Sequence, residues 1–371
     1  MGLPTVTLIV TQRERFSLTE VSLSSILADY ESYPFQLIYV DGNSPPHIQQ
    51  YLQAQAQQHD FMTVIRREHY LRSNEARNLA LPHASDADYV AFLDNDVVVE
   101  KGWLRPLVDC AEAENAAIVA PLILQGDPTS EDIEIHVAGI DTIFRQRKGG
   151  KQWFEQKQLL YATKLRELEQ PLHRRKIDSV EFHCILAHRS FMDGAELDEI
   201  FDSLASHTDL CMQATQQGKS VFFEPASRIV FLNPRQITYF NWEDVKFYRY
   251  KWDEKAVREI FNRTKRKWNL AGDDPSFWAI WKWVIGNRHL PAKWATEEGS
   301  WQRQLLQVCY SRWCPGWLRM WLEAFVLKQS FPDAGVGTRF APKIEVAVEV
   351  PVPHATSSTA TEEPSLSGTA S

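Results

Sequence analysis

Two aspartates separated by one residue follow a strongly apolar segment. Asp94, Asn95 and Asp96 come directly after residues 89–93 (YVAFL) and before three valines. Two carboxylates at one strand end can both reach one divalent cation, because Mg²⁺ and Mn²⁺ prefer oxygen ligands and fill remaining positions with phosphate oxygens. Such an ion neutralises a leaving diphosphate. The pattern predicts a site for a phosphate-bearing ligand, although an aspartate pair also occurs in solvated turns.

Two more polar positions have the chemistry to bind a nucleotide. Asp41 follows the apolar segment 35–40 (FQLIYV), where a carboxylate can accept hydrogen bonds from a base or a ribose. The alternative is an aspartate that closes its own turn. Arg77 lies in the first turn of a helical segment, 74–82, and a guanidinium beside helix amides can hold a diphosphate. The alternative is an ordinary surface arginine.

The segments that must position these side chains alternate between two patterns. Apolar, β-branched strand segments are predicted at residues 5–11, 35–40, 62–66, 89–93 and 117–124, and helices at 17–30, 47–59, 74–82 and 102–114. This alternation predicts an α/β fold with a Rossmann-like, doubly wound, mainly parallel sheet and flanking helices. Such sheets bind ligands beyond the carboxyl ends of their strands. Thr11 and Arg13 follow the first strand, so we expect them near Asp41 and Asp94.

The rest of the chain divides by composition. We predict one domain over residues 1–240, with a nucleotide and metal half (1–126), a polar variable insertion (127–178) and a second half (179–240). Nine of the 13 tryptophans lie between Trp268 and Trp321, in a region 241–340 that we predict to be helical. The final residues, 341–371, have the composition of a disordered tail.

The tryptophan-rich region has two interpretations. Helical spacing over 277–285 and 318–325 favours helices that pack on the catalytic domain. Tryptophan mixed with lysine and arginine also suits helices lying on a membrane surface. No segment is long and apolar enough to span a bilayer, and residues 1–10 do not resemble a signal peptide. We therefore expect a cytoplasmic protein, with a peripheral position at the inner face of a membrane as the alternative.

Composition excludes several classes of protein. The 371 residues carry a net charge of -8, which argues against a nucleic-acid-binding surface. Five cysteines without regular spacing indicate neither a disulfide framework nor a structural zinc site.

Four motifs in order resemble the signatures of family 2 glycosyltransferases, which have the GT-A fold. They are TLIVT (7–11), YVDGNS (39–44), NEARNLA (74–80) and YVAFLDND (89–96), and Gly102-Trp-Leu and AIVAP (117–121) continue the match. The resemblance implies an inverting hexosyltransferase-type enzyme that uses a nucleotide-diphosphate sugar, most often a UDP-sugar, with Mn²⁺ or Mg²⁺.

The resemblance also implies roles for individual residues. Asp41 would contact the nucleobase, Arg77 would lie near the diphosphate, Asp94 near the ribose and metal, and Asp96 would bind the metal. Thr11, Arg13 and Asn95, which follow the first and fourth predicted strands, are further candidates for the donor site, and residues 179–240 would form the acceptor half of the domain.

Two positions depart from the family pattern. The family's carboxylate base lies shortly before a helix, where this chain has SHTDLC (206–211). One alignment places His207 at the base position, and a shift of two places Asp209 there. We predict Asp209, with His207 as the rival, or else a helix-start carboxylate without a catalytic role. Phe231 stands where the family often has a metal-binding histidine, so the sequence does not assign a third metal ligand. His183 is either a contact for the acceptor or a packed strand residue.

These departures define the alternatives. The first is an active glycosyltransferase acting on a glycan, a lipid-linked glycan or a small molecule. The second is a catalytically inactive GT-A-fold protein that binds nucleotides or serves as a scaffold. A nucleotidyltransferase ranks third, because it would need a glycine-rich loop after the first strand, and residues 11–15 contain no glycine.

Overall fold

The computed structural model describes residues 2–146, 150–202, 204–237, 240–271, 284, 286–294, 296, 299–309 and 314–330. The predicted disordered tail (341–371) and most of the predicted helix over 277–285 lie outside these residues.

The first half of the sheet is parallel and alternates with helices, as predicted. Its strands run in the order β3-β2-β1-β4, and every hydrogen-bonded pair among them is parallel. The elements are β1 (Val6–Thr11), α1 (Thr19–Ala28), β2 (Gln36–Gly42), α2 (Pro46–Gln58), β3 (Met62–Arg67), α3 (Ser73–Ala80) and β4 (Tyr89–Asp94), with short 3-10 helices η1 (Phe16–Leu18), η2 (Tyr30–Ser32) and η3 (Leu81–Ala84). The strands β1 and β4 are buried along their whole length, as continuous apolar runs require.

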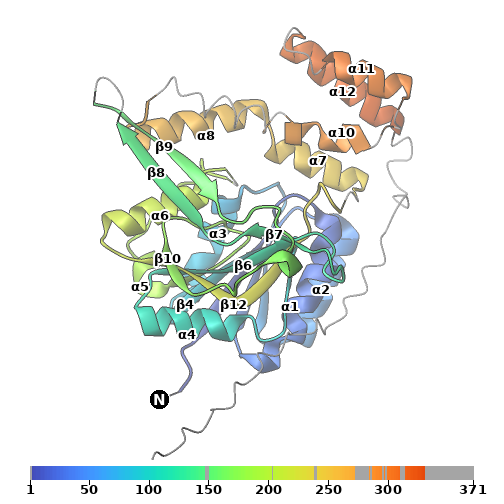
Figure 1. The fold of residues 1–371 in the computed structure, drawn as a ribbon. Helices are drawn as coiled ribbons and strands as arrows, with labels where there is room; N and C mark the ends of the chain where they lie inside the picture. Colours follow the sequence, from blue (N-terminus) through green and yellow to red (C-terminus); the bar gives the residue numbers. More distant parts are fainter. Residues whose placement is uncertain are drawn as a thin grey trace, which may run out of the picture.

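The second half of the sheet mixes directions. The order continues β4-β11-β6-β12-β10, where β11 is antiparallel to both neighbours and β12 is parallel to β6. The elements are β5 (Val97–Val99), α4 (Leu104–Glu114), β6 (Ile118–Gln125), β7 (Glu134–Val137), η4 (Leu165–Glu167), β10 (Arg175–Ile177), β11 (Cys184–His188), α5 (Arg189–Met192), α6 (Ser206–Gln216) and β12 (Val221–Phe231). Separate apolar clusters cover the two faces of the sheet, which confirms the predicted layered α/β architecture (Figure 1).

The segment 127–178 has more regular structure than its polar sequence indicates. It contains β7 and a hairpin formed by β8 (Ile140–Gln146) and β9 (Gln152–Gln158). The hairpin extends away from the main sheet toward α8 (Glu254–Lys267), and Gln152 pairs with Leu270 just beyond that helix (Figure 1). Because much of the hairpin is exposed, with Phe144 48% accessible, its strands lack the apolar face that would reveal them in the sequence.

The helices after residue 240 begin in contact with the N-terminal part of the chain. Helix α7 (Trp242–Lys251) places Phe247 against Phe16, with ring centroids 4.7 Å apart. Helices α10 (Leu290–Trp294), α11 (Trp301–Cys309) and α12 (Gly316–Ser330) follow (Figure 1). None of the helices in the described ranges is long and apolar enough to cross a membrane.

Asp244 joins α7 to the loop after β1. Its fully buried carboxylate accepts hydrogen bonds from the backbone N–H groups of Phe16 (2.7 Å) and Ser17 (3.0 Å) and from the Ser17 hydroxyl. Replacing Asp244 by alanine leaves these donors without their acceptor, so we expect the free energy of unfolding to fall by about 3 kcal/mol.

Urea unfolding measures this change. Glu243→Ala is the matched control, because Glu243 is the preceding residue, is more exposed and pairs with Lys246 at the surface. Its expected effect is below about 1 kcal/mol. Equal stability of Asp244→Ala and the unchanged protein would contradict the prediction.

Candidate active site

The aspartate pair lies at the carboxyl end of β4, in the turn that leads to β5. Thr11 at the end of β1 is the register partner of Asp94, so the ends of the two central strands meet there. Asp94 and Asp96 are both buried. The predicted convergence of polar residues at this edge of the sheet is therefore present in the structure.

Asp94 is held by two arginines. Arg13 Nη1 lies 2.7 Å from its Oδ2, and Arg77 Nη2 lies 3.3 Å from its Oδ1. Burial opposes ionisation of this carboxyl, but the charges of Arg13 and Arg77 outweigh burial and hold its pKa below the ordinary value. Asp94 is consequently a carboxylate with a donor on each oxygen.

Asp96 is in the opposite situation. Neither of its carboxylate oxygens has a hydrogen-bond partner among the residues that the structure describes. Burial raises its pKa to about 7, with Arg13 opposing the rise and Asp94 adding to it. A buried, unpartnered carboxylate is costly unless a cation reaches it. The donor atoms of Asp94, Asp96 and His183 lie within 4.8 Å of one another, and this set fits a divalent cation.

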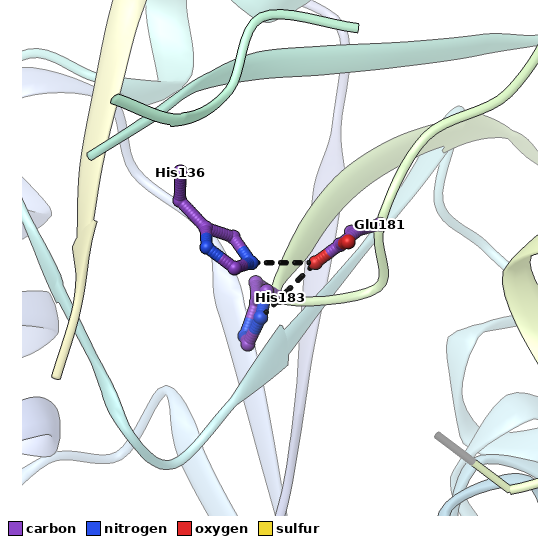
Figure 2. Close-up of side chains that lie close together, drawn as sticks. All are labelled: His136, Glu181 and His183. Atoms are coloured by element: carbon purple, nitrogen blue, oxygen red, sulfur yellow. Dashed lines mark hydrogen bonds and ion pairs between the residues drawn. The ribbon is translucent and has the colours of Figure 1, made fainter. Parts of the chain in front are cut away.

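His183 belongs to a second cluster that the sequence analysis did not identify. Its Nε2 lies 3.3 Å from Glu181 Oε2, and the same oxygen lies 2.9 Å from Nε2 of His136 on β7 (Figure 2). Burial, reinforced by Arg13, lowers the pKa of His183 to about 3, so its ring is neutral. The spacing of Glu181 and His183, two residues apart on one strand approach, could have indicated this cluster from the sequence. His136 could not be found in this way, because it lies in the polar segment 127–178, whose strands show no clear sequence pattern.

A cavity of about 640 Å³ opens beside these clusters. Charged, histidine and aromatic side chains on its wall include Arg13, Glu14, Glu181, His183, His207 and Phe231. Arg13 and His183 also contact Asp94, which does not line the cavity. The two side chains therefore stand between the cavity and the aspartate pair.

The two candidate bases face different surroundings. His207, near the start of α6, lines the cavity, and burial lowers its pKa to about 4, so its ring is a neutral base. Asp209 does not line the cavity. Its carboxylate accepts hydrogen bonds from Lys267 (2.9 Å), the Trp268 indole (2.9 Å) and Gln213 (2.8 Å). The structure thus brings His207 to the cavity and pairs Asp209 with residues at the end of α8.

Asp41 is fully buried and its oxygens already have donors. It accepts hydrogen bonds from Gln12 (3.0 Å), from the backbone and hydroxyl of Ser44 (both 2.9 Å) and from Arg66. This network fixes the end of β2 against the loop after β1. The contact of Asp41 with a nucleobase stays a prediction.

The other predicted donor residues lie behind the cavity wall. Arg77 is buried with its guanidinium 3.8 Å from the Phe182 ring centroid, and burial lowers its pKa to about 10. Asn95 accepts a hydrogen bond from the Arg13 backbone (2.9 Å) and donates one to Arg15 (2.8 Å). Thr11 is fully buried. Among the predicted donor-site residues, Arg13 lines the cavity, whereas Thr11, Arg77 and Asn95 do not. Arg77 holds Asp94 in place, and Asn95 holds the backbone of Arg13.

The layered sheet, with an acidic pair at the carboxyl end of β4, places the protein among GT-A-fold proteins. A crystal structure of GalNAc-T7 with UDP, GalNAc and Mn²⁺ is similar, with a TM-score of 0.51 and 16% identity over 77% of this chain. The match covers 56% of the GalNAc-T7 chain, so this chain spans little more than half of that protein. At this identity the similarity shows the fold alone.

Part of the sequence is similar to a known family. Residues 7–168 match the model of glycosyl transferase family 2. No curated protein sequence matches the chain significantly. This match agrees with the resemblance that the motifs indicated, and it covers residues 7–168 of the 371 residues.

Proposed function

We propose that this protein is an inverting glycosyltransferase that moves a hexosyl group from a nucleotide-diphosphate sugar, most simply a UDP-sugar, to an acceptor hydroxyl. The observation that carries the proposal is the buried Asp96 beside Asp94, whose carboxylate has no hydrogen-bond partner among the described residues, next to a large cavity in a chain whose residues 7–168 match the family 2 model. GalNAc-T7, which shares the fold, was crystallised with UDP and Mn²⁺.

Asp94 and Asp96 would hold Mn²⁺ or Mg²⁺. When bound there, such an ion neutralises the charge of the leaving diphosphate. Arg13 lines the cavity and carries a planar guanidinium, which matches phosphate oxygens in a two-point contact. We assign Arg13 to the diphosphate, while Arg77 keeps Asp94 oriented from behind.

The general base in this proposal is His207. Its neutral ring accepts the proton of the acceptor hydroxyl as the hydroxyl oxygen attacks the anomeric carbon. The bond from that carbon to the diphosphate breaks on the opposite face, which inverts the anomeric centre, and the diphosphate leaves with the electron pair. We propose His207 instead of the expected Asp209, because Asp209 is engaged by Lys267 and Trp268.

For the acceptor and the position in the cell, we propose only a broad class. A glycan, a lipid-linked glycan or a small molecule would suit the cavity. Trp317, Trp321 and Trp301 are 73%, 61% and 56% exposed, which favours a peripheral membrane contact of a cytoplasmic enzyme. Failure of the full chain to co-sediment with anionic vesicles at low salt would contradict that contact.

Calorimetric titration with UDP, GDP, TDP and CDP, with and without Mn²⁺, tests the donor site. We expect Mn²⁺-dependent binding of one nucleotide, most simply UDP, and its loss in Asp96→Asn. Asp109→Asn, an exposed aspartate on α4, is the control and should bind normally. The absence of nucleotide binding by the folded protein would overturn the proposal, and binding without transfer of any donor's sugar would favour the inactive alternative.

A further inference from the structure

We propose that His183 is the third protein ligand of the cation held by Asp94 and Asp96, through Nδ1, and that Glu181 and His136 fix the orientation of its ring. This inference rests on the proposed function, since it completes the same cation site. It assigns a role to three side chains that the transfer step itself does not use.

The positions of the donor atoms support a shared ion. His183 Nδ1 lies 3.5 Å from Asp94 Oδ2 and 3.9 Å from Asp96 Oδ1. Two ligands on one ion, each with a bond of about 2.1 Å, are separated by roughly 3 to 4 Å. The imidazole is fully buried, so solvent does not compete for this nitrogen.

The contact of His183 with Arg13 places the proton of the ring on the far nitrogen. Arg13 Nη1 lies 3.2 Å from Nδ1, and because a guanidinium only donates, Nδ1 must accept. With Nδ1 as an acceptor, the proton of the ring lies on Nε2, which faces the Glu181 carboxylate at 3.3 Å without a hydrogen bond between them. This is the tautomer that a metal ligand at Nδ1 requires, and a carboxylate behind a ligating histidine is the usual supporting arrangement.

Glu181 is itself fixed by neighbours on the hairpin and on β7. One of its oxygens accepts from Gln158, and the other faces His136 Nε2 at 2.9 Å (Figure 2). His136 Nδ1 in turn lies 2.9 Å from Gln125 Oε1, and the Gln125 amide nitrogen donates to Glu134. These contacts place Gln125, His136 and Glu181 in one line behind the His183 ring.

Arg13 occupies the position between the ligand atoms. Its Nη1 lies 2.7 Å from Asp94 Oδ2 and 3.2 Å from His183 Nδ1. A cation bound to both atoms must replace this contact, which releases Arg13 toward the cavity that it already lines. Cation binding and presentation of Arg13 to a diphosphate are thus coupled in this geometry.

His136, Glu181 and His183 also lie close enough to hold an ion by themselves. That arrangement would need the Nε2 lone pair of His183 and would move its proton to Nδ1, where it would face an N–H of Arg13. The observed partners therefore favour the site with the two aspartates.

Pulsed electron paramagnetic resonance of Mn²⁺ bound to the full chain, in the presence of UDP, tests the assignment. We expect a ¹⁴N coupling from a directly bound imidazole, replaced by a ¹⁵N coupling when the protein is made with ¹⁵N-histidine. This labelling needs no variant to fold. His183→Gln should lose the coupling, whereas Glu181→Gln should keep it and raise the Mn²⁺ Kd about 10- to 100-fold. The exposed His173→Gln is the control and should change neither quantity.

The outcomes separate this inference from the proposed function. Mn²⁺ binding that is lost in Asp96→Asn but shows no nitrogen coupling overturns the role of His183 and leaves the function standing. A nitrogen coupling that survives in Asp96→Asn places the ion with His136 and Glu181 and overturns the assignment. Absence of Mn²⁺ binding to the unchanged protein overturns both.

Discussion

Replacing His207 by glutamine should lower kcat for sugar transfer by about 10²- to 10⁴-fold, the usual contribution of a general base. Glutamine has nearly the same size and keeps a polar tip toward the cavity, but it cannot take the acceptor's proton. Mn²⁺ binding should change little, because His207 has no hydrogen bond or ion pair with Asp94 or Asp96 in the structure and, of these two, only the charge of Asp94 reaches it. Single-turnover transfer kinetics and calorimetry on the same preparation measure the two quantities.

The pH dependence gives an independent measure of the same group. A base acts only when unprotonated, and burial lowers the pKa of His207 to about 4. The acid limb of the kcat/KM profile should therefore fall as the pH drops through about 4, and not near 6.5, where an unperturbed histidine titrates.

Asp209→Asn is the matched comparison on the same helix. Because Asp209 pairs with Lys267 and the Trp268 indole, we expect this variant to lose stability while keeping most of its kcat. A folded Asp209→Asn protein without transfer activity, together with an active His207→Gln protein, would reverse the assignment of the base.

The second large effect concerns the stability of the metal-free protein. Asp94→Asn should lower the free energy of unfolding by about 3 to 5 kcal/mol, because it leaves Arg13 and the buried Arg77 without their carboxylate. Asp96→Asn should leave stability unchanged or raise it, because it removes a buried carboxylate that has no hydrogen-bond partner among the described residues. Both variants should lose Mn²⁺ binding.

Urea unfolding in the presence of a chelator makes this comparison. The two substitutions are chemically identical and lie two residues apart, so each is the control for the other. A loss of stability in Asp96→Asn as large as that in Asp94→Asn would mean that Asp96 has a partner in the native protein, and the argument for an open cation site would fail.

The sequence predicted the first half of the fold well because its signals are local. A strand that is buried on both faces is a continuous apolar run, and β1, β2 and β4 are runs of this kind. Polar residues follow the end of each run, and in a parallel sheet these ends lie at one edge. Asp94 and Asp96 were therefore identifiable from the chain alone.

The second half of the site depends on contacts between distant segments. His136 meets Glu181 across 45 residues, and only the pairing of β7 with β6 brings it there. The sequence led us to prefer Asp209 to His207, because the contact of Asp209 with Lys267 and Trp268 cannot be read from it. No periodic pattern encodes such contacts, because polar partners can be placed at any separation along a chain.

The contacts of Asp244 and Arg15 also bear on how the protein is made. The loop after β1, which carries Arg13, is held by the Asp244 carboxylate and by Arg15 donating to the carbonyls of Leu232 and Ile237. Ribosomes add about 5 to 20 residues per second, so these partners emerge roughly 10 to 50 s after the loop. During that interval the nascent chain has the strands of its nucleotide half but not the anchored loop. A nascent chain released before α7 would therefore carry the family motifs without a finished donor site.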